Sequence, residues 1–293
     1  MSRRRGDERW LGLLLLAPAL VVLAAVTLYP GLAVLRLSLE RRVPVFDIAE
    51  SVGLEHYRFL MGDGAFWNAV GVTATFTVVS VALEVVLGLS VALALGEQRR
   101  FRVVTFGLLL LPWCLPGVVT ARMWEWLYHP TAGLVNRLLH SMTGSEVNWL
   151  GDPATALPAI IAADVWRTMP FFALLAYARL VSIPPVLYEA AVVDGASRMA
   201  TFRTVTLPLV APVLLIGTLF RTLDALRAFD LMFVLTGGGP AGTTETLTIY
   251  AYRNLFQTLQ LGFGAAVSVI VFGIVATVAV VYLRALEWTE ARR

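Results

Sequence analysis

Charged residues are scarce in this sequence. They make up 15% of its 293 residues, whereas hydrophobic residues make up 58%. About a quarter of the residues in a typical soluble domain are charged. The mean hydropathy of +0.75 likewise shows that apolar residues predominate. The composition therefore excludes an ordinary soluble domain and predicts an integral membrane protein.

Lysine is absent, so all 23 basic residues are arginines, and cysteine occurs once. The net charge of +3 is no argument for nucleic-acid binding, because the arginines of a membrane protein must first be sorted by side of the bilayer. Cys114 lies in an apolar run with no second Cys or His nearby. The sequence therefore excludes an intrachain disulfide and predicts no metal site.

Motifs for membrane-embedded catalysis are also missing. The histidines His56, His129 and His140 all fall in predicted outer loops, and neither HExxH nor GxSxG occurs. This argues against an intramembrane enzyme. The motif GxxxxGK(S/T) is absent as well, so the chain cannot itself hydrolyse ATP by P-loop chemistry. We predict no catalytic residue and no cofactor in this chain.

Long apolar runs are abundant. A bilayer core of about 30 Å needs roughly twenty apolar residues per helix. Six stretches meet this requirement: 11–37, 67–95, 104–127, 158–182, 208–235 and 262–286. The first is too long for a signal peptide, whose apolar core spans about 7–15 residues. We therefore expect an all-α protein with six transmembrane helices in a single domain over residues 1–293.

The arginines predict the orientation in the membrane. Twelve fall on the side of the two termini: Arg3, Arg4, Arg5, Arg9, Arg99, Arg100, Arg102, Arg198, Arg203, Arg284, Arg292 and Arg293. Five fall on the opposite side: Arg41, Arg42, Arg58, Arg137 and Arg253. Because cytoplasmic loops carry the excess of basic residues, both termini are expected in the cytoplasm.

One cytoplasmic segment, residues 184–207, is polar and rich in small residues although it separates two apolar stretches. Pro184 and Pro185 either end the preceding helix or occupy the first turn of a new one. The spacing from Val186 onward predicts a short helix, and Asp194 with Gly195 predicts where it stops. A second amphipathic helix is expected next, before Pro208 opens the fifth membrane helix.

The short helix is suited to close approach by another protein, because its small side chains expose the backbone and Glu189 and Asp194 provide charged groups at the rim. An amphipathic hairpin lying on the lipid is the alternative. That alternative is weakened because the stretch from Glu189 to Ala196 has no large apolar anchor, whereas interfacial helices usually carry Trp, Phe or Leu.

The segment EAAVVDGASRMATFRTVTLP closely resembles the EAA loop of ABC importer permeases. The positions that match in spacing are Glu189, Ala190, Ala191, Gly195, Leu207 and Pro208, and Val205 stands where Ile is usual. LAPAL followed by YP, GLEHYRFL followed by FWNAV, and VLTGGGP resemble the first permease subunit of carbohydrate importers for maltose, trehalose and glycerol-3-phosphate. LFRTLDALRAFDLMFVLTGG is similar to trehalose permease subunits of actinobacteria.

The resemblance implies the type I ABC importer permease fold and a multi-pass location in the bacterial plasma membrane, surrounded by lipid. It implies an ATPase-coupling role for Glu189, Ala190, Ala191, Asp194, Gly195 and Ala196. The implied partners are a second permease subunit, two ATP-binding cassette subunits that bind ATP and Mg, and an extracytoplasmic sugar-binding protein. No nucleic acid is implied.

Ionisable residues also occur inside the predicted membrane helices. Each charge at the bilayer centre costs about 2.5–3.5 kcal/mol even on the mildest scale, so these residues should face an interior or a water-filled cavity. Arg221, Asp224, Arg227 and Asp230 are spaced three apart, so Arg221 can pair with Asp224, and Arg227 with Asp230. The other positions are Glu84, Arg122 with Glu125, and Asp164 with Arg167.

Two interpretations of these charges stay open: contact with a sugar, or ion pairs that hold helices together. The resemblance implies that the helices flanking the EAA loop line the sugar site. It points to Asp164, Arg167, Thr168, Phe171, Asp224, Arg227 and Ala228 as substrate-binding residues. Arg221 and Asp230 at the ends of the series, with Glu84 and Arg122, are expected to be structural. These positions are more charged than the Asn- and Phe-rich maltose pattern, so the sugar itself is not determined.

The predicted function is a non-catalytic permease subunit of an ATP-driven importer for a disaccharide such as trehalose or maltose. A permease for glycerol-3-phosphate or another small solute is an alternative, with Arg167 and Arg227 as phosphate ligands. A proton-coupled secondary transporter with Asp164 or Asp224 as a relay is a rival from another class. Such carriers often show inverted repeats, which this sequence lacks, and they need no EAA loop.

Overall fold

The computed structural model describes residues 4–97 and 102–290. Its internal contacts divide the chain into two compact units. Unit 1 is the chain up to Asp63 together with Tyr250–Phe272, and unit 2 is Gly64–Ile249 together with the chain from Gly273 onward. The organisation as one domain over residues 1–293 stays a prediction.

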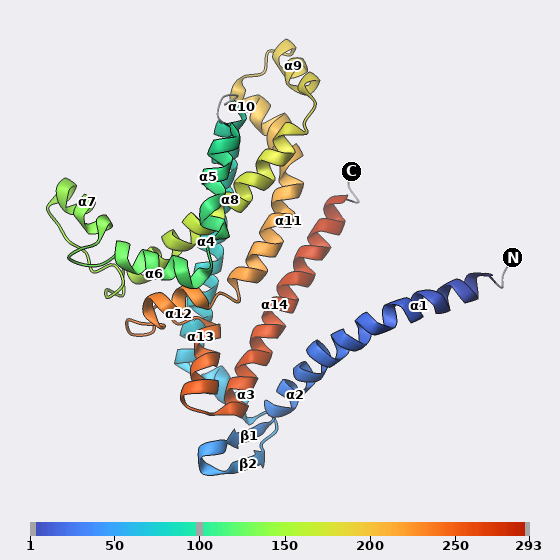
Figure 1. Ribbon diagram of the computed structural model, residues 1–293, viewed down its shortest axis with the longest axis vertical. Coiled ribbons are helices and arrows are strands. Elements are labelled where there is room, and N and C mark those ends of the chain that lie inside the picture. The colour runs from blue at the N-terminus through green and yellow to red at the C-terminus, as the bar shows by residue number, and fades with distance from the viewer. Residues whose placement is uncertain (1–3, 98–101, 291–293) are drawn as a thin grey trace. The chain divides into compact units, whose positions relative to one another are not determined.

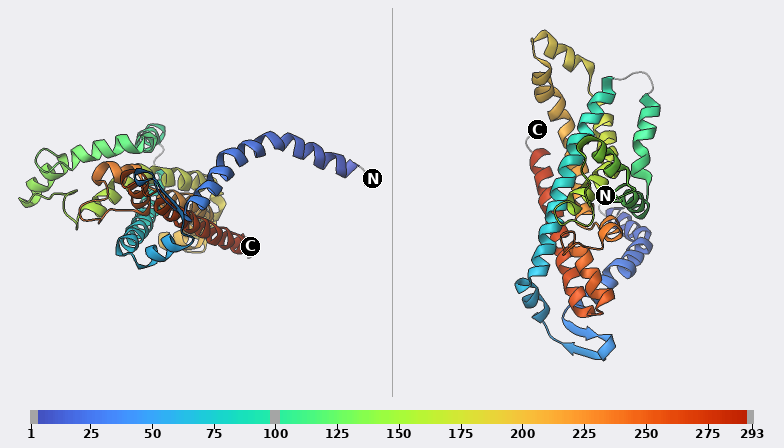
Figure 2. Two further views of the ribbon diagram at one scale, coloured as in Figure 1. Left: turned by 90° about the horizontal axis from the view of Figure 1, so that it is seen from below. Right: turned by 90° about the vertical axis from the view of Figure 1, so that its left-hand side faces the viewer.

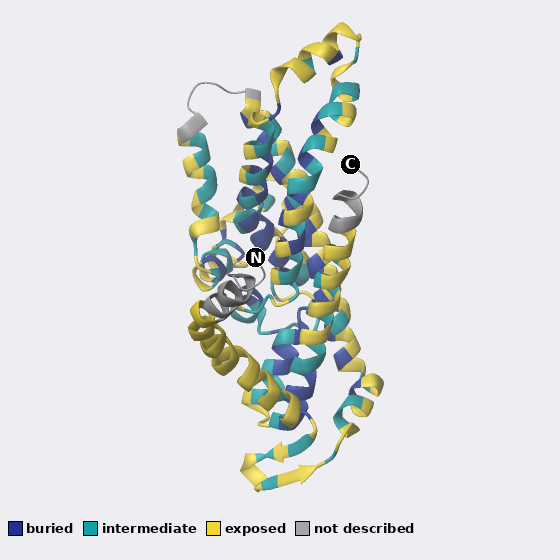
Figure 3. Cartoon of the chain, turned by 90° about the vertical axis from the view of Figure 1, so that its right-hand side faces the viewer, coloured by how far each residue is buried: buried dark blue, intermediate teal, exposed yellow. Residues whose placement is uncertain are grey.

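Unit 1 begins with a long helix and a hairpin. Its elements are α1 (Arg4–Leu23), α2 (Tyr29–Leu37), β1 (Glu40–Val43), β2 (Ile48–Ser51) and α3 (Glu55–Gly62). A π-helical turn joins α1 to α2, so the helix continues to Leu37. No residue of Leu14–Leu37 is buried, and all of them are exposed except Val34 and Leu37, which are half-buried, so the span is mostly yellow in Figure 3. Such an apolar, uncovered helix is suited to a lipid or protein environment rather than to water.

Unit 2 is a helical bundle. Its elements are α4 (Gly64–Glu97), α5 (Arg102–Cys114), α6 (Gly117–Leu127), α7 (Leu134–Thr143), α8 (Ala156–Val181), α9 (Pro185–Val193), α10 (Arg198–Thr201), α11 (Leu207–Ala225) and α12 (Asp230–Thr236). The helices α13 (Leu247–Tyr252) and α14 (Leu261–Glu290) contribute residues to both units. Within unit 2, α4, α8 and α11 pack side by side, and α9 lies at the end of α8 that leads toward α11 (Figure 1).

Five helices among the described residues are long and apolar enough to cross a membrane. They cover Leu14–Leu37, Gly64–Gly96, Ala156–Val181, Arg198–Ala225 and Leu261–Ala285. A sixth crossing is possible only if the bent pair α5 and α6 forms one span. The mostly helical membrane fold expected from the sequence is therefore confirmed, whereas the orientation of the termini stays a prediction.

The expectation of one continuous helix over 104–127 is wrong. The α5 and α6 helices meet at a 97° bend (Figures 1 and 2). Pro116 is the reason: it has no N–H to donate, its ring clashes with the preceding turn, and its backbone is extended at φ −58° and ψ 144°. The apolar run is long enough to cross the bilayer, but its proline breaks it.

The range 208–235 is also interrupted. The α11 helix ends at Ala225, and α12 begins only at Asp230. Pro208 does not open a separate helix, because α10 continues through a π-helical turn, Phe202–Thr206, into α11. A π-turn leaves room for a proline that cannot donate a hydrogen bond. The second helix of the 184–207 segment is thus the start of the membrane helix itself.

Candidate functional site

A buried ion cluster joins three helices of unit 2. The guanidinium of Arg221 in α11 contacts Glu84 of α4, with Nε 2.9 Å from Oε2 and 3.1 Å from Oε1. The same guanidinium donates to Asp164 of α8. Arg221 is only 6% exposed, Glu84 is fully buried and Asp164 is 2% exposed. Charges buried this deeply are tolerated because they are paired and hydrogen-bonded.

The two buried carboxylates have further donors. The Thr168 hydroxyl donates to Glu84 Oε1 at 2.6 Å, and Arg167 Nη2 donates to Asp164 Oδ1 at 3.3 Å. Arg167 is half-buried, and its Nε has no hydrogen-bond partner among the described residues. Asp164 and Thr168 are therefore held inside the bundle, whereas Arg167 lies at its edge.

Asp224 forms the exposed edge of the cluster. Arg221 Nη1 donates to Asp224 Oδ2 at 3.4 Å, and the Asp224 side chain is 66% exposed. The expected pair of Arg227 with Asp230 does not form in the described part of the chain. Since α11 ends before Arg227, the two residues no longer lie three apart on one helix. Arg227 is exposed, and its Nε donates to the carbonyl of Leu223 at 3.0 Å.

The remaining predicted substrate residues lie apart from the ions. Phe171 is half-buried and stacks on Trp113, with ring centroids 5.8 Å apart and planes 25° apart. Ala228 packs against the hydrophobic core, and its carbonyl accepts from Thr248 Oγ1 at 2.7 Å. The structure thus joins Asp164, Arg167, Thr168 and Asp224 through Arg221, and leaves Phe171, Arg227 and Ala228 outside that network.

The sequence missed how these charges are connected. Glu84 and Arg221 were expected to be structural, but their partnership was not predicted, because 137 positions separate them. No local spacing reveals such a pair. The local pair of Arg221 with Asp224 was predicted, whereas the exposed ion pair of Arg122 with Glu125, at 2.7 Å, was not.

The α9 helix stops where Asp194 and Gly195 predict. Gly195 has φ +72°, Ala196 N donates to the Ala191 carbonyl at 2.9 Å, and Gly195 N donates to the Val192 carbonyl at 3.0 Å. This pattern is a Schellman motif, in which a left-handed glycine closes a helix. Between Glu189 and Ala196, the exposed residues are Glu189, Ala190, Val192, Val193, Asp194 and Gly195, while Ala191 is buried and Ala196 is half-buried.

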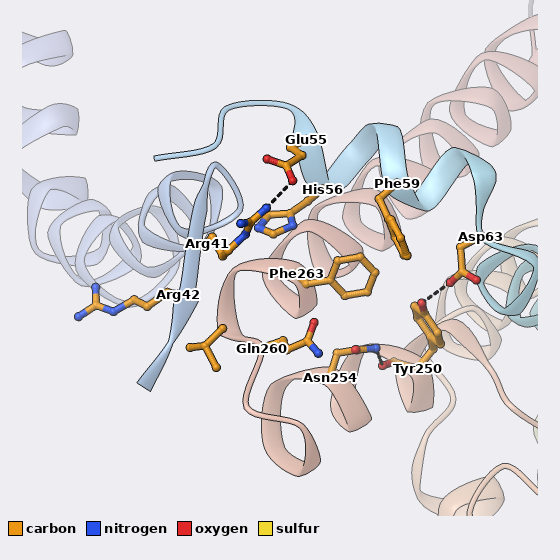
Figure 4. Close-up of a pocket in the computed structure, with 11 residues that line it drawn as sticks. Arg41, Arg42, Glu55, His56, Phe59, Asp63, Tyr250, Asn254, Gln260 and Phe263 are labelled. Atoms are coloured by element: carbon orange, nitrogen blue, oxygen red, sulfur yellow. Dashed lines mark hydrogen bonds and ion pairs between the residues drawn. The ribbon is translucent and has the colours of Figure 1, made fainter. Parts of the chain in front are cut away.

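Unit 1 contains a separate pocket of about 450 Å³ (Figure 4). The Phe263 ring lies in it, edge-on to His56 and Phe59 with centroids 5.8 and 5.7 Å away. The Tyr250 hydroxyl donates to Asp63 at 2.5 Å. None of the residues predicted to bind substrate or to couple to an ATPase lines this pocket.

The sequence and fold resemble those of known transporters. Residues 84–286 match the family described as binding-protein-dependent transport system inner membrane component. The chain belongs to this family. The permease is 42% identical over 283 residues to the trehalose/maltose transport system permease protein MalF of Thermococcus litoralis, which covers 97% of this chain and 96% of the relative.

Two further comparisons agree. The trehalose transport system permease protein SugA of Mycobacterium tuberculosis is 36% identical over 281 residues, covering 96% of the permease and 90% of the relative. A chain of a bacterial ABC transporter involved in the import of the polysaccharide alginate has a TM-score of 0.83 at 21% identity, with 97% of both chains covered, and so shares the fold. The permease is therefore a membrane component of a transport system and not itself an enzyme.

Proposed function

We propose that the permease forms half of the translocation pathway of an ATP-driven importer for a disaccharide of the trehalose or maltose type. The observation that carries this proposal is the 42% identity, over nearly the whole of both chains, to a trehalose/maltose permease. The proposed assembly contains a second permease subunit, two ATPase subunits and an extracytoplasmic sugar-binding protein. Both termini lie in the cytoplasm in this proposal.

The exposed edge of the ion cluster supports a site for a hydroxyl-rich substrate. Asp224 is exposed beside the buried cluster, and the Arg167 side chain is 23% exposed. Carboxylates and guanidinium groups form strong hydrogen bonds, and an aromatic pair such as Phe171 with Trp113 provides an apolar ring surface. In this proposal Asp224, Arg167 and Arg227 contact the sugar, with Phe171 and Ala228 beside them, whereas Asp164 and Thr168 position the helices.

The α9 helix supports docking of an ATPase subunit. Glu189 and Asp194 are exposed together with Val192 and Val193, whose side chains are uncovered in this chain. An exposed apolar patch with a charged rim is typical of a protein interface. We assign the coupling role to Glu189, Ala190, Ala191, Asp194, Gly195 and Ala196 as part of the same proposal.

ATP-dependent uptake by the reconstituted complex and its binding protein tests the substrate, with labelled trehalose, maltose and glycerol-3-phosphate compared in one preparation. Saturable uptake of trehalose or maltose is expected. Uptake of glycerol-3-phosphate alone would overturn the sugar assignment, and Arg167 and Arg227 would then be the phosphate ligands to test by substitution. Uptake driven by a proton gradient without ATP would indicate a secondary transporter, which Asp164 disfavours because both its oxygens already accept from arginines.

A further inference from the structure

The three helices that contain the ion cluster are also joined by a steric contact closer to α9. Phe172 of α8 is fully buried between glycines of the two neighbouring helices. A Cβ atom at Gly88 of α4 would lie 2.5 Å from the Phe172 Cβ, and a Cβ atom at Gly217 of α11 would lie 3.2 Å from Phe172 Cε1. At Gly88 the added Cβ would also lie 2.9 Å from the backbone nitrogen of Ala173, so α4 and α8 approach closely there, while Gly217 of α11 leaves room for the side chains of Phe172 and Leu175.

The steric contact and the ion cluster lie in register. Gly88 is four residues from Glu84 on α4, and Gly217 is four residues from Arg221 on α11, in both cases on the side toward α9. One helical turn therefore separates the two contacts on each helix. Sliding of α11 along α4 would disturb the directional hydrogen bonds of Arg221 and the glycine contacts at the same time.

The packing continues from Phe172 to the α9 segment. A buried hydrophobic cluster follows the same side of the bundle, and its members are Ala92, Phe172, Ala176, Ile183, Val210 and Leu214. Tyr188 of α9 packs against this cluster, and its hydroxyl lies 3.3 Å from Thr206 Oγ1. Arg179 Nε donates to the Leu209 carbonyl at 2.9 Å, which ties the end of α8 to the start of α11.

We propose that Arg221 is a positioning residue for transport: it locks α4, α8 and α11 into one body that carries a displacement of α9 to the exposed edge at Asp224. A continuous chain of packed side chains and ion pairs is the physical route for such coupling. Bulk packing alone permits small slips between apolar surfaces, whereas the Arg221 hydrogen bonds fix the relative position of three helices at once. The inference rests on the proposed function, because it assumes that α9 receives the motion of an ATPase.

Double electron–electron resonance distances between spin labels on the working complex test directly whether α4, α9 and α11 move as one rigid body. In a Cys114→Ser background, paired spin labels replace the exposed residues Val86 of α4, Ile216 of α11 and Val186 of α9. Distances are compared between the nucleotide-free complex and the complex trapped with ATP and vanadate. We expect all three distances to be the same in both states. As a control, the distance from one of these labels to a label on the second permease subunit should differ between the two states, which shows that the complex has changed conformation. A change in the Val86 to Ile216 distance would overturn the proposal.

A substitution test separates positioning from simple stability. Arg221→Met is combined with Glu84→Gln and Asp164→Asn, so that neither buried carboxylate paired with Arg221 is left charged, while the exposed Asp224 can turn to water. Sugar uptake and ATP hydrolysis are measured in the same vesicles at saturating binding protein. We expect ATP hydrolysis to persist. The number of sugar molecules transported per ATP hydrolysed should fall about tenfold or more, which is within the range typical of coupling between two sites. The matched control is Arg122→Met with Glu125→Gln, an exposed pair on α6, which should keep the normal ratio.

An assembled triple variant with the normal ratio would reduce Arg221 to a stabiliser of the fold and overturn the proposal. If the triple variant does not assemble, the spin-label distances decide the question, because they are measured in a complex whose ion cluster is intact. Failure of the proposed substrate gives a different result: the unsubstituted complex moves no sugar, yet vanadate trapping requires only ATP turnover and still reports the distances.

Discussion

The side chains of Arg221 and Glu84, 137 positions apart in the sequence, form a buried ion pair with both carboxylate oxygens within 3.1 Å of the same nitrogen. This pair links α11 to α4, and Asp164 brings α8 into the same contact. Because this ion pair is buried, substitution of either partner should change the stability of the fold. A buried charge that loses its partner cannot be solvated, whereas an exposed charge turns to water.

Substitution of Glu84 by Ala should therefore destabilise the permease strongly. The expected loss is about 3–5 kcal/mol, the usual cost of removing one partner of a buried pair. Thermal unfolding of the purified complex measures it. Glu125→Ala is the matched control, because its pair with Arg122 is exposed and should contribute less than about 1 kcal/mol. Equal losses in the two variants would contradict the buried pair.

Gly88→Ala should destabilise the bundle by overpacking. The new methyl group would lie 2.5 Å from the Phe172 Cβ, and forced contacts of this kind cost about 1–3 kcal/mol. Gly71→Ala on the same helix is the control, since a Cβ there meets nothing within 4 Å. The unfolding temperature should fall for the first variant and stay constant or rise for the second. A fall in both would point to a cause other than the Phe172 contact.

Gly195→Ala should weaken the end of α9. Its φ of +72° is a left-handed conformation that costs an L-residue with a side chain roughly 1–2 kcal/mol. Space is not the reason, because nothing lies within 4 Å of the added Cβ. We expect lower sugar transport per ATP, with uptake and hydrolysis measured together. Gly195→Asn, which tolerates this conformation better, should recover part of the loss.

Glu189→Ala should uncouple ATP hydrolysis from uptake while leaving substrate recognition intact. Glu189 is exposed on α9 and forms no ion pair with another described residue of the chain, so the fold should tolerate its removal. The sugar concentration at half-maximal uptake is the control reading and should not change. Normal sugar transport per ATP in this variant would contradict docking of the ATPase at α9.

Asp224→Ala should abolish uptake and leave assembly intact. Its side chain is 66% exposed and makes only a 3.4 Å contact with Arg221, so little of the fold depends on it. Uptake is compared with the amount of complex recovered after purification. Loss of the complex instead would show that Asp224 acts as an ion-pair partner and not as a substrate ligand.

The local features of this permease could be predicted from its amino-acid sequence. The apolar runs predicted its membrane helices, and Asp194 with Gly195 predicted the end of α9, because hydrophobicity and left-handed backbone preference act within a few residues. The EAA spacing, carried by Glu189 and Gly195, predicted the family. The pair of Arg221 with Asp224, at spacing three, was also predicted from the sequence, since neighbours on one helix surface meet wherever the helix is continuous.

Which distant groups meet depends on the packing of the helices and could not be predicted from the sequence. The partnership of Arg221 with Glu84 and the enclosure of Phe172 by Gly88 and Gly217 depend on how three helices pack, and no periodicity along one helix encodes that choice. The breaks after Ala225 and at Pro116 were likewise hidden inside apolar runs long enough for a bilayer. Hydropathy measures how strongly a segment prefers lipid over water. Directional hydrogen bonds and close packing determine which helices pack against one another.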